Sequence, residues 1–301
     1  MRFSFWIPNS LTWQDTLAAA RHVDATGWDG LWYADHFMPN AVEPADGPIH
    51  EAWSVLAGIA AAVPRVRLGP LVAGNTYRNP AVTAKIATTI DHISGGRVVL
   101  GLGAGWQENE HRAYGLEFNT FRWRFDRLEE ACQILKSLFS EPRSTFAGSH
   151  YSLDAAPLDP KPVQARLPLL IGGGGEKRTL RIVANYADEW NVWGMPDVLA
   201  AKGAVLERHC ASIGRDPATI EHSAVALLFL TDDAAQLASL RARDLGRPAL
   251  IGTPGELQEI VGAYRDAGVD ELIVPGFTFR SPAEREETLD RFLTEVATPF
   301  R

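Results

Sequence analysis

Short apolar runs alternate with amphipathic stretches along the whole chain of 301 residues. Apolar runs of four to eight residues have the length of buried strands, and stretches with apolar residues at helical spacing predict helices. The predicted strands are 3–7, 30–34, 66–73, 98–102, 169–172, 189–192, 223–230 and 271–274. The predicted helices are 13–26, 51–63, 81–93, 125–139, 177–186, 198–213, 255–267 and 282–297.

This alternation predicts an α/β fold in which a parallel sheet closes into a TIM (β/α)8 barrel. An open, doubly wound sheet is the alternative. Barrels of this kind reach the length of this chain as one domain, so we expect residues 1–301 to form a single domain. Three insertions are expected: a polar, proline-rich loop near 38–50, a β-hairpin with a proline-rich stretch near 143–164, and a helical segment near 231–254.

Composition excludes several classes of protein. The net charge is −8 and no basic run occurs, which argues against binding to nucleic acid or to an anionic membrane. No apolar run approaches the roughly 20 residues of a membrane span. Cys132 and Cys210 form no paired motif, so no disulfide framework is expected. The first predicted strand begins at once, so we expect no signal peptide and a cytoplasmic location.

The strands at 30–34 and 98–102 end abruptly in polar groups and glycines, which in a barrel is where catalytic residues lie. Asp35 and His36 place a carboxylate beside an imidazole, a pair suited to proton transfer. The structural alternative is that Asp35 caps the next segment and His36 is a hydrogen-bonded loop residue. Glycines follow the other strand, and we expect them to let a flat ligand approach the backbone: Gly101, Gly103 and Gly105.

A second glycine run, residues 172–175, leaves a strand and opens a helix. Free backbone N–H groups and the helix dipole at such a position favour a phosphate, and Lys177 and Arg178 add positive charge. A flexible turn with a solvated Lys-Arg pair is the alternative. Neither glycine run matches a known fingerprint, because Trp106 replaces the third glycine of the dinucleotide motif and Glu176 replaces the P-loop glycine before Lys177.

Other kinds of catalytic centre receive no support. The eight histidines show no ligand spacing, so no metal site is predicted, and no Gly-x-Ser-x-Gly nucleophile motif occurs. Several tryptophans lie in or just after predicted strands, where they would wall a water-poor pocket suited to a flat ring. Those predicted to line a substrate pocket are Trp6, Trp106 and Trp193.

Four segments together resemble the bacterial luciferase-like superfamily of flavin and deazaflavin oxidoreductases. They are residues 27–36, 79–82, 91–106 and 170–177, and the third is the most specific. The chain is most similar to the branch that uses the deazaflavin coenzyme F420. The resemblance covers essentially the whole chain, and it implies a TIM barrel with insertions that usually forms a dimer, here through helices 51–63 and 81–93.

The resemblance also implies roles for individual residues. Asp35 and His36 would lie beside the cofactor ring, with His36 in proton transfer. Sugar-phosphate dehydrogenases of the family carry a glutamate base where this chain has Trp106, which argues against such a substrate. The remaining cofactor contacts would be a backbone bulge at Ala73 and Gly74, ring and ribityl contacts from Ala104, Gly105 and Asn109, and a phosphate cradle of Gly174, Gly175, Glu176, Lys177, Arg178 and Thr179.

Three functions are consistent with these residues. The first is an oxidoreductase that transfers a hydride between F420 and a small organic substrate, with His36 moving a proton and Asp35 orienting the ring or the imidazole. The second is an FMN-dependent two-component monooxygenase, which would need a flavin reductase as partner. The third is a non-catalytic flavin-binding protein, against which the Asp-His pair and the glycine run argue. The substrate stays open.

Overall fold

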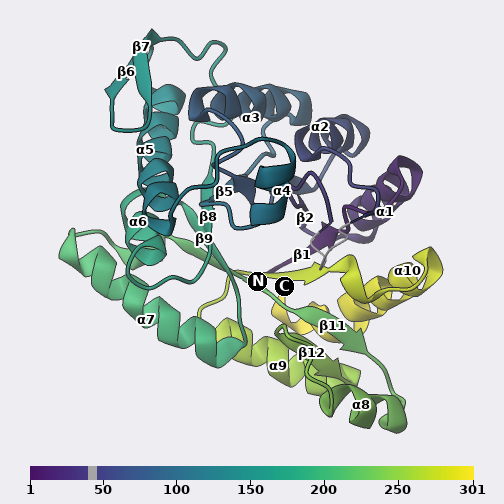
Figure 1. The fold of residues 1–301 in the computed structure, drawn as a ribbon. Helices are drawn as coiled ribbons and strands as arrows, with labels where there is room; N and C mark the ends of the chain where they lie inside the picture. The colour runs from purple at the N-terminus through teal and green to yellow at the C-terminus, as the bar shows by residue number, and fades with distance from the viewer. Residues whose placement is uncertain (40–45) are drawn as a thin grey trace.

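The fold is described from a computed structural model, which covers residues 1–39 and 46–301 (Figure 1). Its parallel strands form one nine-stranded sheet in the order β3-β2-β1-β13-β10-β9-β8-β5-β4. Helices lie around the outside of this sheet, which curls into a barrel and confirms the predicted fold. The strands are β1 Arg2–Ile7, β2 Gly30–Tyr33, β3 Arg67–Pro70, β4 Ala73–Gly74, β5 Leu100–Gly103, β8 Leu169–Gly172, β9 Glu189–Trp193, β10 Glu221–Val225 and β13 Glu271–Pro275.

The barrel closes through its third strand, predicted as one run at 66–73. A cis peptide bond between Leu71 and Val72 separates this strand into β3 and β4. Both pieces face the next barrel strand, since Leu68 bridges to Val98 and β4 pairs with β5. A Cβ on Gly69 would lie 1.9 Å from the Val99 carbonyl oxygen, so only glycine permits this approach. The open sheet is thereby excluded.

The helices of the barrel begin and end close to the predicted positions. Thr12, Asn79 and Thr253 accept hydrogen bonds from the first turns of α1, α3 and α9, as helix-capping residues do. The longest, α5, begins four residues before its predicted start, because Thr120 caps it there. The helices are α1 Trp13–Thr26, α2 Ala52–Ala62, α3 Pro80–Ser94, α5 Phe121–Ser140, α6 Thr179–Tyr186, α7 Pro196–Ser212, α9 Pro254–Asp266 and α10 Pro282–Arg291.

Two apolar clusters stabilise the barrel. The larger lies between the strands and the surrounding helices, and the smaller fills the inside of the barrel with Trp32, Leu71, Val99, Leu170, Val225 and Ile273. Buried charged side chains lie at the amino-terminal ends of the barrel strands, on the first residues of β3, β9 and β13. Arg67 donates 2.6 Å to Glu189 and lies 3.4 Å from Glu271, which also accepts 2.9 Å from Trp32 Nε1. The positive charge of Arg67 compensates the charges of the two carboxylates at a position from which water is excluded.

The insertions are confirmed in part. The hairpin near 143–164 is present as β6 Ser144–Ala147 and β7 Ser152–Ala156. The prediction of one strand at 223–230 is wrong. The first half belongs to β10, and the second half is a separate strand, β11 Leu227–Leu230, which leaves the barrel. There it pairs in parallel with β12 Ala249–Gly252, so the helical insertion contains a strand besides α8 Ala234–Arg241. The insertion near 38–50 lies partly outside the described residues.

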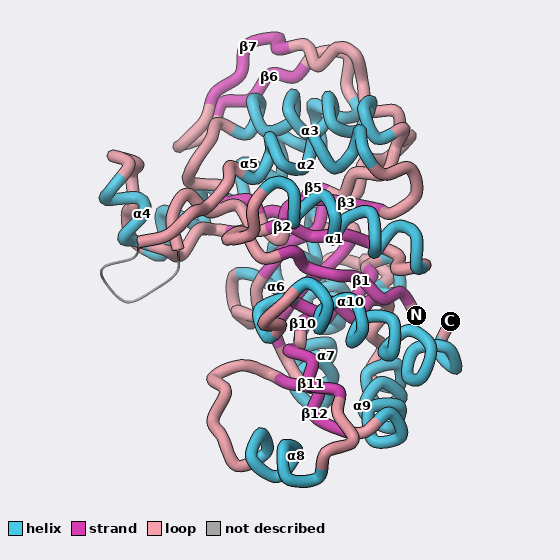
Figure 2. The backbone as a smooth tube through the Cα atoms, turned by 90° about the vertical axis from the view of Figure 1, so that its right-hand side faces the viewer, coloured by secondary structure: helices cyan, strands magenta, loops and turns pink. Residues whose placement is uncertain are grey.

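One helix, α4 Glu108–Ala113, was not predicted. Figure 2 shows α4 projecting from the barrel at the end where the strands finish. No helix among the described residues is both long and apolar enough to cross a membrane. Cys132 and Cys210 are free, buried thiols, and burial raises the pKa of Cys132 far above its usual value, so the thiol is unreactive.

Candidate active site

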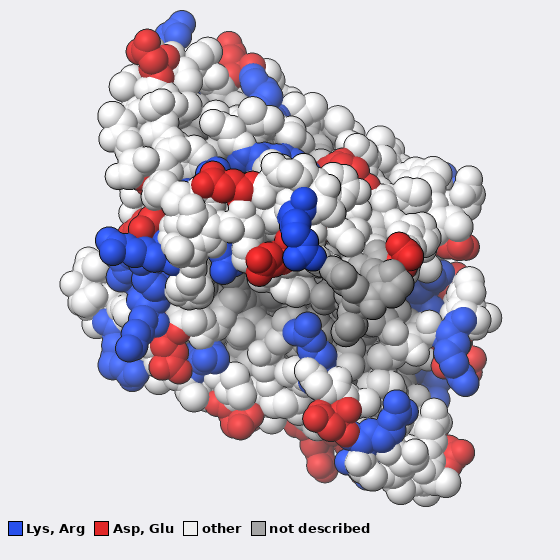
Figure 3. Space-filling model, viewed as in Figure 1, with Lys and Arg blue, Asp and Glu red and all other residues white. Residues whose placement is uncertain are grey.

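The predicted catalytic and cofactor-binding residues form β4 or follow β2, β5 and β8, four strands whose carboxyl ends lie at the same end of the barrel. Strand direction explains this, because all four strands run parallel to one another in one sheet. The face of the molecule that carries α4 is hollowed near its centre, as Figure 3 shows. The glycine cradle, the Asp35-His36 pair and the first turn of α4 therefore share one end of the molecule.

Asp35 is fully buried behind this end of the barrel. Its carboxylate accepts from both terminal nitrogens of Arg78, at 2.6 and 3.2 Å, and from the Gly74 backbone N–H at 3.3 Å. Arg78 also donates 2.9 Å to Glu51 at the start of α2. Burial raises the pKa of Asp35, and Arg78 offsets this only in part. Asp35 thus holds the backbone of β4 in place through Gly74, and its hydrogen bonds go to partners other than the imidazole of His36.

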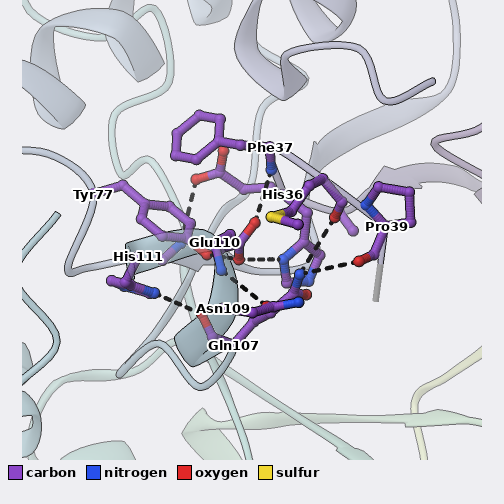
Figure 4. Close-up of polar contacts among 12 residues, drawn as sticks. His36, Phe37, Pro39, Tyr77, Gln107, Asn109, Glu110 and His111 are labelled. Atoms are coloured by element: carbon purple, nitrogen blue, oxygen red, sulfur yellow. Dashed lines mark hydrogen bonds and ion pairs between the residues drawn. The ribbon is translucent and has the colours of Figure 1, made fainter. Parts of the chain in front are cut away.

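The imidazole of His36 has a different carboxylate partner, which sequence reasoning missed (Figure 4). His36 Nδ1 lies 2.8 Å from Oε1 of Glu110, a residue of α4 that is fully buried. The same carboxylate accepts 2.9 Å from the Phe37 backbone N–H and also accepts from the hydroxyl of Tyr77. Among the described residues, His36 Nε2 has no hydrogen-bond partner.

These contacts determine which atoms of Glu110, Tyr77 and His36 carry a proton. Burial by itself raises the pKa of Glu110, but the hydrogen bonds from His36, Tyr77 and Phe37 lower it below its usual value. Burial, together with the hydrogen bond and charge of Glu110, raises the pKa of Tyr77, so the phenol keeps its proton and donates it. An ionised carboxylate only accepts. A neutral His36 therefore carries its proton on Nδ1 and exposes a lone pair on Nε2.

The rest of the segment after β5 supports this arrangement. Asn109 Oδ1 accepts 2.9 Å from the Glu110 backbone N–H, and the buried His111 joins the Gln107 carbonyl to the Thr76 hydroxyl at 2.7 Å each. Trp106 is 56 % exposed, and its ring lies edge-on to His36 at 5.5 Å. The run of polar residues at 107–111 directly after a glycine-rich strand end is the sequence signal that could have identified Glu110.

The glycines in and after β5 pack closely against other parts of the protein. A Cβ on Gly101 would meet the Pro70 carbonyl oxygen at 2.1 Å, and one on Gly103 would meet Val72 at 2.8 Å. Gly105, at φ +77°, would meet the Thr76 hydroxyl at 2.5 Å. All three glycines therefore permit close approach of other parts of the protein, which accounts for them without a ligand and leaves the expected approach of a flat ligand a prediction. The backbone of Ala104 and Gly105 still lies at the barrel mouth.

The second glycine run leads from β8 into α6. Gly173, at φ +125°, donates 2.8 Å to the Asn191 carbonyl, and Lys202 of α7 donates 2.8 Å to the Gly174 carbonyl. A Cβ on Gly174 would lie 2.9 Å from Val192, and one on Gly175 would lie 2.8 Å from the Thr179 hydroxyl. The loop is closely packed on one side, and the opening N–H groups of α6 have no partner within the helix.

The positive charges beside this loop come in part from other residues than the sequence predicted. Arg178 pairs with Asp126 of α5 and lowers the pKa of that carboxyl, so its charge is compensated. Lys177 is exposed, and Lys202, which was not predicted, lies 3.7 Å from Glu176. The predicted cradle residues therefore lie together, with Lys177 and Lys202 as the neighbouring cations. Groups of His, Cys, Asp and Glu suited to a metal are absent from residues 1–39 and 46–301.

The three predicted pocket tryptophans fall into two groups. Trp6 and Trp193 contact each other, with ring centroids 5.9 Å apart, whereas Trp106 contacts His36. Trp6 is near the end of β1 and Trp193 ends β9.

Comparison with known proteins identifies the family. The model of the luciferase-like monooxygenase family matches residues 1–245. The chain belongs to this family. It is 34% identical over 175 residues to an F420-dependent glucose-6-phosphate dehydrogenase of Amycolatopsis mediterranei, covering 58% of this chain and 50% of that one. It is 33% identical over 199 residues to the pyrimidine monooxygenase RutA of Stutzerimonas stutzeri, covering 62% and 52%.

The matched part spans about half the length of these curated relatives. Solved structures agree over nearly the whole chain. An F420-dependent secondary alcohol dehydrogenase superposes with a TM-score of 0.85 at 20% identity, covering 98% of both chains. At this identity the likeness establishes the fold, and the predicted membership of the luciferase-like family is confirmed by the family model.

Proposed function

We propose that the protein is an oxidoreductase that transfers a hydride between the deazaflavin F420 and a small organic substrate. The observation that carries this proposal is the buried Glu110 carboxylate on His36 Nδ1, while Nε2 has no hydrogen-bond partner in residues 1–39 and 46–301. Reduction of a carbonyl, or oxidation of an alcohol, requires a proton at the substrate oxygen besides the hydride. The similarity to F420-dependent dehydrogenases supports this assignment.

The residues present fit the phosphate of such a cofactor. The glycine run leads through residues 176–178 into the first turn of α6, where the Leu180 N–H is taken by the Gly175 carbonyl, and the remaining backbone N–H groups of this turn are the candidate donors to the phosphate. Lys177 and Lys202 supply positive charge beside them, and Thr179 begins the helix. Gly174, Gly175, Glu176, Lys177, Arg178 and Thr179 would hold the phosphate. Asp35, Ala73, Gly74, Ala104, Gly105 and Asn109 would place the ring and the ribityl chain, Asp35 through its bond to Gly74.

When bound, the deazaflavin supplies a carbon that accepts or donates a hydride. The chain itself moves the proton. His36 Nε2 takes the proton from a substrate hydroxyl in the oxidative direction and returns it to the carbonyl oxygen in the reductive one. Glu110 stabilises the imidazolium that forms when Nε2 is protonated, because the ionised carboxylate faces Nδ1. Trp106 lies edge-on to His36 and forms part of the wall beside the imidazole.

An FMN-dependent two-component monooxygenase is the second candidate, supported by the similarity to RutA. FMN carries the same ribityl phosphate, so the cradle serves either cofactor. This alternative would need a flavin reductase as partner. In either case we propose a homodimer that pairs through α2 and α3.

Replacing His36 with Ala tests the proposed proton transfer. A group that transfers a proton in the transition state affects turnover more than it affects binding of the cofactor. Turnover measured by stopped-flow absorbance of the cofactor should fall by about tenfold to ten-thousandfold, with the dissociation constant of the cofactor changed much less. A variant that turns over at the wild-type rate would contradict the role of His36.

A further inference from the structure

An aromatic cluster lies at the barrel mouth on strands other than those that carry His36 and the glycine cradle. Trp6 is near the end of β1, Trp193 ends β9, and Phe277 follows β13. The ring centroids of Trp6 and Phe277 are 5.2 Å apart, and those of Trp6 and Trp193 are 5.9 Å apart. Trp6 and Trp193 are half-buried and Phe277 is 51% exposed. The planes of Trp6 and Trp193 are tilted by 49° and those of Trp6 and Phe277 by 67°, so the rings form a partly exposed aromatic wall on which a flat ligand can stack against one ring and meet the edges of the others.

A guanidinium lies over one edge of this cluster. Arg247, just before β12, has its guanidinium carbon 4.9 Å from the centroid of Trp193. The other arginines that lie over aromatic rings all have polar partners: Arg67, Arg78, Arg127 and Arg265 pair with carboxylates, and Arg124 donates to the Gly105 carbonyl. Arg247 is exposed and has no ion pair or hydrogen bond with any residue that the structure describes. The position that an acceptor occupies at those five arginines is open at Arg247.

The cluster holds a second unused donor. The indole N–H of Trp6 is buried and has no partner within the described parts of the chain. A buried donor without an acceptor costs about 1–3 kcal/mol, so an acceptor atom on a ligand is favoured at that position. Two unpaired donors beside one aromatic surface favour a ligand that has a flat body and carries oxygen acceptors.

We propose that Trp6, Trp193, Phe277 and Arg247 form a substrate subsite for a flat, conjugated organic acid. The conjugated body stacks on one ring of the wall and contacts the edges of the others, and the carboxylate receives two N–H groups of the guanidinium. A single cation matches a monoanion, which favours a carboxylate over a doubly charged phosphate ester. The proposal rests on the proposed function, since it names the substrate class of that same barrel mouth.

Binding of cinnamate and of its neutral isostere cinnamamide tests the subsite. Both probes are flat and conjugated, and they differ in the group that would meet Arg247. Isothermal titration of the purified protein, without cofactor and again with oxidised F420, should give at least about tenfold tighter binding of cinnamate. Arg247→Gln should abolish this preference. Arg243→Gln is the matched control, an exposed arginine of the same excursion, and it should preserve the preference.

Trp193→Leu should weaken binding of both probes, because both use the aromatic surface. Equal affinity for the two probes, no binding of either at millimolar concentration, or an unchanged preference in Arg247→Gln would each overturn the subsite. Titration without cofactor separates this proposal from the proposed function. A protein that binds cinnamate as described but fails to bind F420 would retain the subsite and lose the hydride-transfer assignment.

Discussion

Replacing Glu110 with Gln should reverse the position of the proton on His36. The carboxylate accepts three hydrogen bonds, from His36 and Tyr77 on one oxygen and from the Phe37 backbone N–H on the other. An amide has one oxygen, so it can serve only one of these two sides as acceptor. The backbone N–H of Phe37 can only donate, whereas imidazole and phenol can each donate or accept.

The free-energy difference decides how the new amide is oriented in the Glu110→Gln variant. With its oxygen toward His36, the amide N–H would face the Phe37 N–H, and two buried donors would oppose each other at a cost of about 1–3 kcal/mol for each unsatisfied group. With its oxygen toward Phe37, the amide N–H groups face His36 Nδ1 and the Tyr77 oxygen, and both of these atoms can accept. The second orientation forces the imidazole proton from Nδ1 to Nε2. A neutral His36 then presents a donor in place of the lone pair.

Nitrogen-15 NMR of the imidazole rings measures this directly, at a pH where the ring is neutral. The His36 signals are assigned by comparison with His36→Gln. The wild type should show a protonated Nδ1, and Glu110→Gln a protonated Nε2. With an active substrate, turnover in the variant should fall by about 10²–10⁴-fold with little change in cofactor affinity.

Glu108→Gln is the matched control, because it makes the same change on the exposed side of α4 and should leave both readouts unchanged. An unaltered tautomer in Glu110→Gln would refute the assignment of Glu110 as the residue that positions His36.

Further predictions concern binding, stability and assembly. Gly174→Ala should weaken cofactor binding severalfold, because a Cβ there would lie 2.9 Å from Val192, whereas Gly255→Ala, with nothing within 4 Å, should not; fluorescence titration compares the two. Burial alone raises the pKa of Glu271, but Arg67 and Arg2 lower it below 4.5. The hydrogen bonds from His36, Tyr77 and Phe37 likewise lower the pKa of Glu110. The stability contributed by both carboxylates is therefore complete above about pH 4.5 and is lost as the pH falls through their folded-state pKa values, which urea unfolding across that range would show. Light scattering at micromolar concentration should report a dimer, and a monomer would contradict pairing through α2 and α3.

The barrel could be predicted from the sequence because each strand and helix carries its own periodic pattern and end signals. The run 223–230 shows where this fails. It is continuously apolar, and only the pairing of its second half with β12 determines that it leaves the barrel. Local pattern likewise could not locate the cis peptide bond that separates β3 from β4.

The site shows the same limit. Asp35 and His36 are adjacent in sequence, which suggested that one orients the other, but their side chains point to different partners. The residue that contacts the imidazole lies 74 positions away on α4. Such a contact is fixed by tertiary packing, and sequence pattern carried only an indirect signal of it, the polar run after β5.

Parallel titration of the purified protein with F420 and with FMN, each oxidised and reduced, tests the central claim most directly. The account predicts that F420 binds and that the bound deazaflavin exchanges a hydride with substrate without consuming oxygen. Tighter binding of reduced FMN, with oxygen consumed in the presence of substrate, would contradict the account and establish the monooxygenase alternative.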